Sequence, residues 1–545
     1  MKDLKTTTKA TGLRYWMARV LEECEHVAGD FSADPVHDLR VALRRCRSMA
    51  DGMIAMDPDR DWKAMKKAGK RLFQRLGALR DVQIMMEWIE KLHPTAAHVD
   101  MGDSPALPKS EENLGDSADA APAESAADRR HDAPARGLLG ILRGREIEQK
   151  REARAALEEF DRRQWRQGSK SLLLRAARIR PGSAVFKHLA LERWTAAREL
   201  HTRAMRNRSQ VAFHTLRIGI KRFRYIVENF LPVEHNAWSN DLKHMQDLLG
   251  EVHDLDVLWA TALSCRVFPE ASRKEWHARI VEERTKRIDE YREKTVGPDS
   301  LWNVWRAGLP QGKQIQAIAT QRMKLWAKAL DPDFAHSERV ARLAVELYDG
   351  LLATGLIESP NGADARSSLQ VAAMLHDVGK SRGNEAHHKT SFELIRSHVN
   401  PLGWNPEYLQ RAAVVARFHA GALPTRGHKA LRDLLPREQK IAIQLAAILR
   451  LANAFDAAHD GRIRRVQVEN VNAKSKDPKR RTNGFLRKPA KLGANEAVVV
   501  AAEEFVPGSS TAQAVAAERY LLETVLRRPV VVKAMKNPVH RARFG

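Results

Sequence analysis

The segment His37-Asp-Leu-Arg40-Val-Ala-Leu-Arg44-Arg45-Cys-Arg47 recurs, with substitutions, as His214-Thr-Leu-Arg217-Ile-Gly-Ile-Lys221-Arg222-Phe-Arg224. Both copies carry His, Arg, Lys or Arg, Arg and Arg at offsets 0, 3, 7, 8 and 10. At about 100° per residue, offsets 0, 3, 7 and 10 lie on one side of an α-helix, and the apolar residues between them lie on the other. The repeat therefore predicts two helices, each with an apolar back and a cationic front.

Cations at helical spacing repel one another, so each stripe loses stability unless an anion lies against it. An isolated charge run is usually a solvated face, but a repeat matched in spacing and apolar backing favours a binding function. Further basic residues precede a Leu-Gly pair in each half, Leu76-Gly77 and Leu249-Gly250. The candidate anion-binding residues are His37, Arg40, Arg44, Arg45, Arg47, Lys70, His214, Arg217, Lys221, Arg222, Arg224 and Lys243.

The composition also indicates a polyanionic partner. The chain has 92 Lys and Arg against 68 Asp and Glu, a net charge of +24, which is typical of proteins that bind nucleic acid, anionic lipid or a phosphate polymer. Single-stranded nucleic acid usually requires aromatic faces between the cations, and the stripes offer only Phe223, on the apolar side, and Tyr225. We therefore expect a phosphate polymer, with RNA as the weaker alternative.

Cysteine usage and hydropathy indicate the compartment. Cys24, Cys46 and Cys265 lie far apart and form neither a disulfide framework nor a zinc-finger spacing, which favours a reducing environment. The sequence shows no signal peptide and no run of about 18 uncharged apolar residues. We expect a cytoplasmic protein without a membrane span, with association to polyphosphate granules as an extension of that expectation.

The sequence predicts a mainly α protein. Helical periodicity covers residues 5–93 and 138–295, and the acidic, polar stretch 95–137 between them predicts a disordered insertion within one domain. Glycine and proline mark a linker over 296–314, and a second helical domain covers 315–460. The rest, 461–545, predicts a small α+β extension: strands over 463–468, 497–500 and 529–533, a helix over 512–527, and a basic loop from Lys474 to Lys491.

The two signatures resemble the CHAD domain, the conserved histidine α-helical domain, over residues 5–295. The resemblance rests on the two stripes, on Tyr225, and on the Leu-Gly pairs that lead to Asp81 and Asp254. Members of this family are built as two similar helical bundles that face each other across a basic channel, and they bind inorganic polyphosphate. The resemblance therefore implies inorganic polyphosphate as the partner of the twelve candidate residues. The acidic insertion departs from the family pattern.

A different constellation occupies residues 334–460. It consists of His336, His376-Asp377-Val-Gly-Lys380, His387-His388-Lys389, His419 and Asp456. Neutral imidazoles and carboxylates on several helices suit a divalent transition metal whose site keeps positions open for water and substrate. A metal centre is therefore expected in the second helical domain.

This region resembles an HD-domain phosphohydrolase, which implies His336, His376, Asp377 and Asp456 as ligands of a divalent metal: Mn, Fe, Mg or Zn. The strings Arg417-Phe-His419 and Leu449-Arg-Leu-Ala-Asn-Ala-Phe-Asp456 are similar to the C-terminal half of the exopolyphosphatase and guanosine pentaphosphate phosphohydrolase family. As catalytic residues we expect Lys380 to balance charge in the transition state, and His388 and His419 to hold a second metal or act as acid and phosphate donors.

The sequence differs from that family in one respect that affects where catalysis is expected. Phosphate cleavage in the family is attributed to actin-like ATPase-fold domains, for which this sequence has no room, so any catalysis is expected at the HD site itself. The leading hypothesis is a polyphosphate-binding protein whose HD domain hydrolyses polyphosphate or a phosphorylated nucleotide. Two alternatives stay open: a non-enzymatic polyphosphate scaffold associated with granules, and an RNA-binding protein. The sequence leaves open whether the HD site is active, and it leaves the metal and the oligomeric state unassigned.

Overall fold

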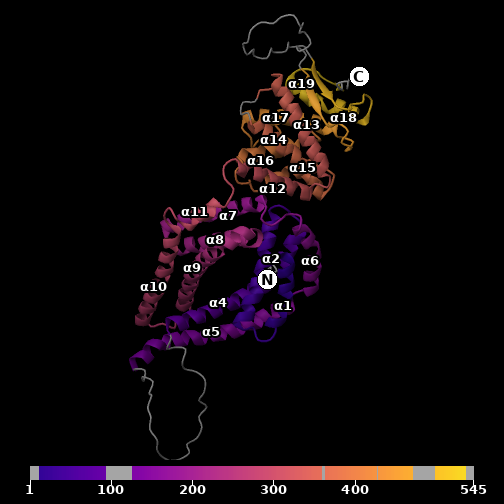
Figure 1. Cartoon of the computed structure of the whole chain (residues 1–545). Helices are drawn as coiled ribbons and strands as arrows, with labels where there is room; N and C mark the ends of the chain where they lie inside the picture. Colours follow the sequence, from indigo (N-terminus) through magenta and orange to yellow (C-terminus); the bar gives the residue numbers. More distant parts are fainter. Residues whose placement is uncertain (1–11, 94–125, 359–362, 426, 470–496, 536–545) are drawn as a thin grey trace, which may run out of the picture. The chain divides into compact units, whose positions relative to one another are not determined.

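The structure, a computed structural model, describes residues 12–93, 126–358, 363–425, 427–469 and 497–535. The described residues are mainly helical, as predicted, with one three-stranded sheet near the C-terminus (Figure 1). They form two compact units, of which the first ends at Gly312 and the second begins at Lys313. In the described part of the chain no helix has the length and apolar character needed to cross a membrane.

The first unit contains the repeat. Its helices are α1 (Leu13–Val27), α2 (Ala33–Ile54), α3 (Arg60–Ala68), α4 (Lys70–Leu92), α5 (Ala126–Glu158), α6 (Arg162–Ala176), α7 (Ala184–Asn207), α8 (Gln210–Phe230), α9 (Pro232–Cys265), α10 (Glu270–Thr295) and α11 (Leu301–Ala307). The first stripe lies on α2 and the second on α8, and the Leu-Gly pairs lie on α4 and α9. Both stripes are therefore helical, as predicted.

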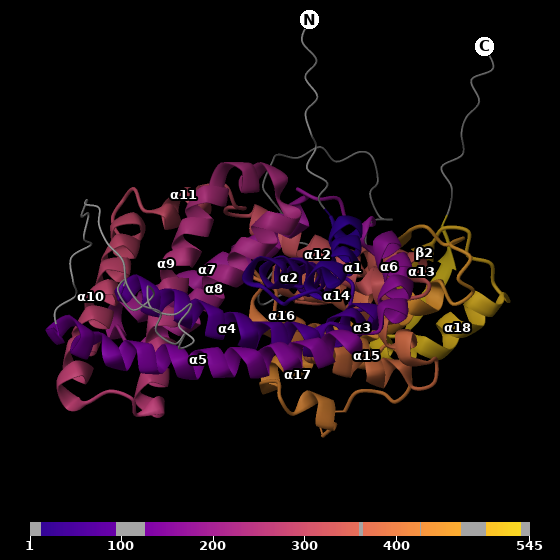
Figure 2. The ribbon, with the colours of Figure 1, turned by 90° about the horizontal axis from the view of Figure 1, so that it is seen from below.

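The two halves of the first unit pack through equivalent helices. Helix α2 contacts α8, α4 contacts α9, and α4 and α5 run side by side (Figure 2). The apolar backs of the stripes are buried in the core: Leu39, Leu43, Cys46, Leu216, Ile220 and Phe223 are all 0% exposed. Burying such side chains removes apolar surface from water, and this stabilises the packing of the helices that carry the stripes.

The segment 95–137 is only partly as predicted. Residues 95–125 lie outside the described residues, but 126–137 form the beginning of α5 and not a disordered segment. The helix starts early because Ala135 and Leu138 are fully buried in a core cluster that also contains Trp88 and Leu255. Most residues of this stretch are small or polar, so its few apolar positions did not indicate a helix in the sequence.

The predicted linker 296–314 also differs. It contains α11, whose Trp302 and Trp305 are fully buried in the first unit. Trp194 Nε1 donates to the carbonyl oxygen of Trp302 at 3.2 Å, and the ring of Trp305 lies 5.7 Å from that of Phe223. Two indoles bury so much apolar surface that they hold this Gly- and Pro-rich segment against the bundle. The first domain therefore extends beyond residue 295.

The second unit is helical up to its C-terminal extension. Its elements are α12 (Gln314–Leu330), α13 (Phe334–Ala353), α14 (Ala363–Leu375), η2 (Val378–Arg382), α15 (His387–Arg396), α16 (Pro406–Arg417), η3 (Lys429–Leu431), α17 (Pro436–Phe455), β1 (Val466–Glu469), β2 (Val498–Ala502), α18 (Ser510–Glu518), α19 (Tyr520–Leu526) and β3 (Val530–Ala534). The helix predicted over 512–527 is thus two helices. The predicted basic loop, from Lys474 to Lys491, lies outside the described residues.

The sheet of the extension has the order β1-β2-β3. Strand β1 is antiparallel to β2, with Val468 opposite Val500, and β2 is parallel to β3, with Val500 opposite Val532. Val500 is fully buried in the same core cluster as the apolar residues of α13 and α17. The extension therefore completes the core of the second unit and does not form a separate domain.

Two glycine-to-alanine substitutions, one at a close helix contact and one in open space, test the packing of α8 on α7. A Cβ at Gly219 would lie 2.8 Å from Leu200 Cδ1 and 3.3 Å from Ala197 Cα, whereas a Cβ at Gly144 in α5 would meet nothing within 4 Å. We expect Gly219→Ala to lower the free energy of unfolding by about 1–3 kcal/mol through overpacking. Gly144→Ala should raise it by about 0.5–1 kcal/mol through helix propensity. Denaturant unfolding measures both, and equal effects would contradict the packing described.

Candidate functional site

The two stripes meet in one cluster of cations. Burial, together with the nearby charges of Arg217, Arg44 and Arg40, lowers the pKa of the Lys221 ammonium to about 7. Arg40 and Arg44 come from α2, and Arg217 and Lys221 come from α8. We call these four residues the cationic cluster. It occupies repeat offsets 3 and 7 of both copies, where the packing of α2 on α8 brings like charges together.

The Leu-Gly pairs make room for the two arginines. A Cβ at Gly77 would lie 3.9 Å from Arg40 Nη2, and a Cβ at Gly250 would lie 4.0 Å from Arg217 Nε. Each arginine therefore lies across the glycine of its own half, at van der Waals distance. The glycines are equivalent positions of the repeat, so the same local geometry is built twice.

Two aspartates belong to the same centre. Burial and the neighbouring Asp81 raise the pKa of Asp254 to about 6, against the effect of Arg217. Burial also raises the pKa of Asp81, against the effect of Arg40. The equivalent carboxylates of the two halves thus lie close enough to affect each other. Sequence reasoning recognised both as parts of the repeat but not as members of the site, although their repetition beside the glycines was the signal.

Several polar atoms of this centre have no internal partner. Among the described residues, Arg44 Nε, Arg217 Nε and the Tyr225 hydroxyl are buried and make no hydrogen bond. The Arg44 guanidinium lies over the Tyr225 ring, with Cζ 5.6 Å from the centroid. Buried polar groups in folded proteins are nearly always hydrogen-bonded, so these donors indicate a missing anionic ligand.

The structure directs other predicted cations elsewhere. Arg45 pairs with Glu228, and its Nη1 lies 3.4 Å from Asn229 Oδ1. Arg47 Nη1 donates to the carbonyl oxygen of Lys66 at 2.6 Å. Offsets 8 and 10 of the first copy therefore serve packing between helices and not the cationic cluster.

Four more of the predicted cations also lie outside the cationic cluster. Arg224 Nη2 lies 3.6 Å from Glu228 Oε1, and Lys243 Nζ lies 2.6 Å from Asp247 Oδ2 on the same helix. Lys70 and Arg222 are exposed. These four side chains are not brought into the cluster.

The two histidines of the stripes lie beside the cluster. Burial lowers the pKa of His37, as do Arg44, Arg80 and Arg40 around it. His214 Nδ1 lies 3.2 Å from His253 Nδ1, so one of these rings donates to the other. Burial and then Arg217 lower the pKa of His253 to about 4. His253 follows the Leu-Gly pair of α9 and was not predicted as a site residue.

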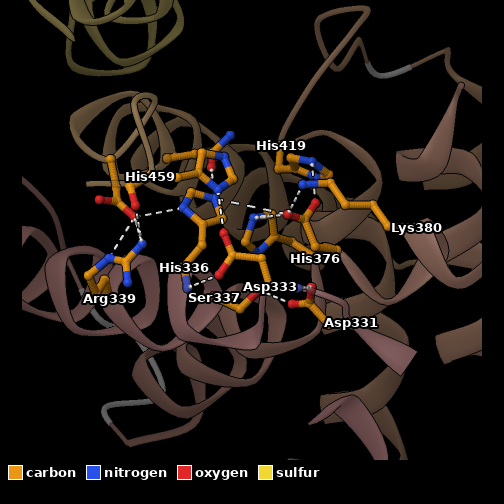
Figure 3. A network of polar contacts seen from close by, with 12 residues as sticks. Asp331, Asp333, His336, Ser337, Arg339, His376, Lys380, His419 and His459 are labelled. Atoms are coloured by element: carbon orange, nitrogen blue, oxygen red, sulfur yellow. Dashed lines mark hydrogen bonds and ion pairs between the residues drawn. The ribbon is translucent and has the colours of Figure 1, made fainter. Parts of the chain in front are cut away.

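The second unit brings its histidines together from several segments (Figure 3). Asp333 caps α13 by accepting a hydrogen bond from the His336 backbone N–H at 3.3 Å. His376 and Asp377 connect α14 to η2, and His419 follows the end of α16. Helix ends thus supply most of the site, because side chains there project beyond the packed helix bodies.

Asp377 lies at the centre of this site. Its Oδ2 is 4.0 Å from His336 Nε2 and 3.5 Å from His376 Nε2. Its Oδ1 is 3.2 Å from His387 Nε2 and 3.6 Å from His419 Nε2. We call His336, His376 and Asp377 the first triad, and Asp377, His387 and His419 the second triad; each gathers its ligand atoms within 4.8 Å.

Three of the imidazoles have their tautomer fixed by the backbone. His376, His387 and His419 each hold Nδ1 against a carbonyl oxygen three residues earlier, at 2.7, 2.9 and 2.7 Å. Because a carbonyl only accepts, Nδ1 carries a proton in all three rings. In the neutral rings of His376 and His419 the Nε2 lone pair is left on the side of Asp377. His387 differs, because the hydrogen bond that its Nε2 donates to Asp377 Oδ1 raises its pKa. His376 Nε2 is buried without a hydrogen-bond partner in the described part of the structure. Imidazole nitrogens gathered around a carboxylate are a donor set that suits a cation.

Cations and imidazoles hold the carboxyl group of Asp377 ionised. Burial alone would raise its pKa, but His376, His387, His419 and Lys380 together lower it well below its usual range. Lys380 Nζ donates to Asp377 Oδ2 at 2.5 Å. Lys380 therefore lies at the site, as the sequence predicted, on the side of the first triad.

Asp456 and His388 lie elsewhere than the resemblance implied. Asp456 Oδ2 accepts from His336 Nδ1 at 2.7 Å and from Arg339 Nε at 2.8 Å, so it orients His336 from behind and is outside both triads. His387, and not His388, completes the second triad. Adjacent residues on a helix point about 100° apart, so a His-His pair does not reveal which ring faces the site. Arg339 was also missed, because one arginine on a helix carries no pattern.

Comparison with known proteins finds two family matches, one in each unit. Residues 13–263 match the family model of the CHAD domain, and residues 320–492 match that of Ppx/GppA phosphatase, domain III. The predicted order of a CHAD domain followed by an exopolyphosphatase-like C-terminal region is thus confirmed. Among solved structures, the crystal structure of the CHAD domain from the plant Ricinus communis matches with 19% identity and a TM-score of 0.33, over 54% of this chain and 88% of that chain. No curated protein gives a significant match.

The tautomers provide a test of the site geometry. In metal-free protein we expect His376 and His419 to be neutral with the proton on Nδ1, because burial lowers both pKa values and the carbonyls of Ala373 and Ala416 accept that proton. Nitrogen-15 NMR of the imidazoles distinguishes the two tautomers. A proton on Nε2 of either ring would contradict the convergence of lone pairs on Asp377.

Proposed function

We propose that this protein binds inorganic polyphosphate at the cationic cluster and hydrolyses a phosphorylated substrate, polyphosphate or a nucleotide, at a divalent metal centre in the second unit. The matches to the CHAD domain and to Ppx/GppA phosphatase, domain III, support a polyphosphate-related protein. The observation that carries the proposal is a pair of half-buried arginines, Arg44 on α2 and Arg217 on α8, whose buried Nε atoms have no hydrogen-bond partner among the described residues.

A phosphate polymer fits the cationic cluster better than a nucleic acid. Guanidinium groups bind phosphate oxygens through charge-assisted, often bidentate hydrogen bonds, and a rigid pair of helices holds them in place. Recognition of single-stranded RNA relies on bases that stack on aromatic faces. Phe223 is fully buried in the core, and the Tyr225 ring is already covered by Arg44. The cluster therefore offers phosphate ligands without a platform for bases.

The donor set of the second unit fits divalent metal ions. His336, His376 and Asp377 would hold one ion, and Asp377, His387 and His419 a second, with one oxygen of Asp377 directed toward each triad. When bound, such ions polarise a phosphoryl oxygen and lower the pKa of water. Nitrogen and oxygen donors in this mixture suit Mn, Fe or Zn better than Mg.

The protein's own residues position this centre and compensate charge. Asp456 holds the Nδ1 proton of His336 and is itself fixed by Arg339 and by the Gly461 N–H, at 2.8 and 3.1 Å. This leaves His336 Nε2 on the side of Asp377. The Lys380 ammonium, beside Asp377, is placed to balance the negative charge that a phosphoryl group accumulates during transfer.

One contact favours a second candidate function. Lys380 Nζ lies 2.5 Å from the Asp377 oxygen that faces the first triad, where it competes with a metal for the same lone pairs. A unit that kept this ion pair would bind polyphosphate through the first unit and remain a non-enzymatic scaffold. Metal content without phosphate release from polyphosphate or nucleotides would favour this reading.

Binding of long-chain polyphosphate tests the first half of the proposal. We expect Arg40→Ala combined with Arg217→Ala to weaken the affinity at least about a hundredfold, because each arginine contributes a charge-assisted hydrogen bond worth about 1.5–3 kcal/mol. Arg151→Ala combined with Arg166→Ala, two exposed arginines of the same unit, should change it little. Titration at several salt concentrations measures both, and equal affinity of the two double variants would refute the cluster. Competition by RNA at physiological salt tests the remaining alternative.

Metal stoichiometry and phosphate release test the second half. Asp377→Asn should lose both metal ions, because its carboxylate belongs to both triads, whereas His419→Ala should lose only the ion of the second triad. Phosphate release should vanish in Asp377→Asn and fall strongly in His376→Ala. His398→Ala, a histidine outside both triads, serves as control. Elemental analysis with a phosphate-release assay measures both, and release that is independent of Asp377 would exclude catalysis at this site.

A further inference from the structure

Arg417 is a buried cation without an anion in the second unit. It is the last residue of α16, two positions before His419 of the second triad, and only 8% of its surface is exposed. Within the described residues, its Nη1 is buried and has no hydrogen-bond partner. A guanidinium group stays charged at every pH of interest, so its burial without a counterion is costly.

Two other buried arginines of the same unit show the usual arrangement. Arg411 pairs with Glu438, and Arg450 Nε donates to Glu518 Oε2 at 2.6 Å. These arginines carry their own carboxylates and serve the fold. Arg417 differs from them, because no carboxylate within the described chain contributes to the electrostatics of its guanidinium.

Histidines face Arg417 from two other segments. Its charge contributes to lowering the pKa values of both His388, on α15, and His428, in the loop before η3. His428 Nδ1 accepts from the Ala430 N–H at 3.2 Å, so the proton of the neutral ring is on Nε2, which is left as a donor. The ring of His428 lies against Phe418, with centroids 4.9 Å apart. The Arg417 guanidinium lies over the same Phe418 ring, with Cζ 5.4 Å from the centroid, so Arg417 and His428 contact one aromatic ring.

The loop after α16 is held in one conformation beside Arg417. Arg450 Nη1 donates to the carbonyl oxygens of Phe418 and Gly421, both at 3.1 Å, and so fixes the loop. Gly421 has φ +73°, and a Cβ there would lie 3.0 Å from His388 Nε2. Glycine is required at 421 both for the backbone conformation and for the space that the His388 ring occupies.

The position adjoins the second triad. The ring centroid of His388 lies 6.3 Å from that of His419 and 5.8 Å from that of His387. A group bound at Arg417 would therefore neighbour a group bound between His387 and His419. Both positions attract anions, one through a guanidinium and one through a metal centre.

We propose that Arg417, with His388 and His428, forms an anion subsite that holds a second phosphate group of the substrate beside the second triad. The inference rests on the proposed hydrolysis of a phosphorylated substrate and narrows its class: the substrate carries at least two linked phosphates. Inorganic polyphosphates and nucleoside polyphosphates meet this requirement, and simple phosphate monoesters do not. The fork of a guanidinium suits the paired oxygens of a phosphate group, which a lysine would match less well.

Kinetics of Arg417→Met test the subsite. We expect the KM for inorganic tripolyphosphate to rise about tenfold or more, because a charge-assisted hydrogen bond is lost. The KM for p-nitrophenyl phosphate should stay unchanged, because this monoester has no second phosphate. Arg417→Lys should give a KM for tripolyphosphate between those of the parent protein and Arg417→Met. Arg396→Met, which removes an exposed arginine paired with Asp433 at 2.9 Å, should leave the KM for both substrates unchanged. An unchanged KM for tripolyphosphate, or an equal rise for both substrates, would overturn the subsite.

A binding measurement separates this inference from the question of catalysis. In full-length, metal-loaded protein that carries Arg40→Ala and Arg217→Ala, calorimetric titration with inorganic pyrophosphate reports the second unit. Adding Arg417→Met should weaken this binding about tenfold or more even if no phosphate is released. Binding without turnover would keep the subsite and refute hydrolysis, whereas turnover with unchanged pyrophosphate affinity would do the reverse.

Thermal unfolding excludes a merely structural role. Without phosphate, Arg417→Met should unfold at the same temperature as the parent protein or higher, because an unpaired buried charge has been removed. Pyrophosphate should raise the unfolding temperature of the parent more than that of the variant. A marked loss of stability in the variant without phosphate would assign Arg417 to the fold and contradict the subsite.

Discussion

Apolar packing in this protein forces chemically similar groups together without giving them internal partners. In the first unit, burial of Leu43 and Ile220 behind the stripes presses the cations of α2 toward those of α8. In the second unit, four imidazoles gather around one carboxylate. Hydrophobic burial offsets the electrostatic cost of both arrangements, because it acts over many side chains while the repulsion is local. An ion of the right sign would lower that cost at either centre.

The repeat is preserved where it builds the centre and diverges where it builds the packing. Arg40 and Arg217 have equivalent neighbours, since each crosses the glycine of its own half. Offset 8 differs, because Arg45 reaches Glu228 of the other half whereas Arg222 is exposed. The equivalent edge residues of α2 and α8 have different surroundings. On one helix the residue contacts the other helix, and on the other helix it faces solvent. The aspartates 81 and 254 follow the conserved part of the arrangement.

The sequence predicted most of the elements but only part of each site. The period of the apolar residues revealed α2 and α8, and the histidine and aspartate pattern between 334 and 460 predicted most of the residues that gather around Asp377. The choice between His387 and His388 could not be made, because one step along a helix turns a side chain by about 100° and helix boundaries are uncertain by a residue or two. Asp456 was assigned to the metal by resemblance, but its carboxylate lies at the far nitrogen of His336. Helix α11 was not predicted. The glycine and proline residues around it indicated a linker, and its two tryptophans were not taken as evidence for a buried helix.

The sequence by itself determined the two-copy helical repeat, and it predicted the sign of the ligand for each unit and the residue types that would bind it. Those properties depend on local periodicity and on the chemistry of side chains, which are written in the chain. Only the tertiary structure decided which cations are left without partners, which oxygen of Asp377 serves which triad, and that Arg417 is buried without a carboxylate. Such properties depend on contacts between segments far apart in the chain. Local sequence does not show whether a polar group finds a hydrogen-bond partner on a distant segment.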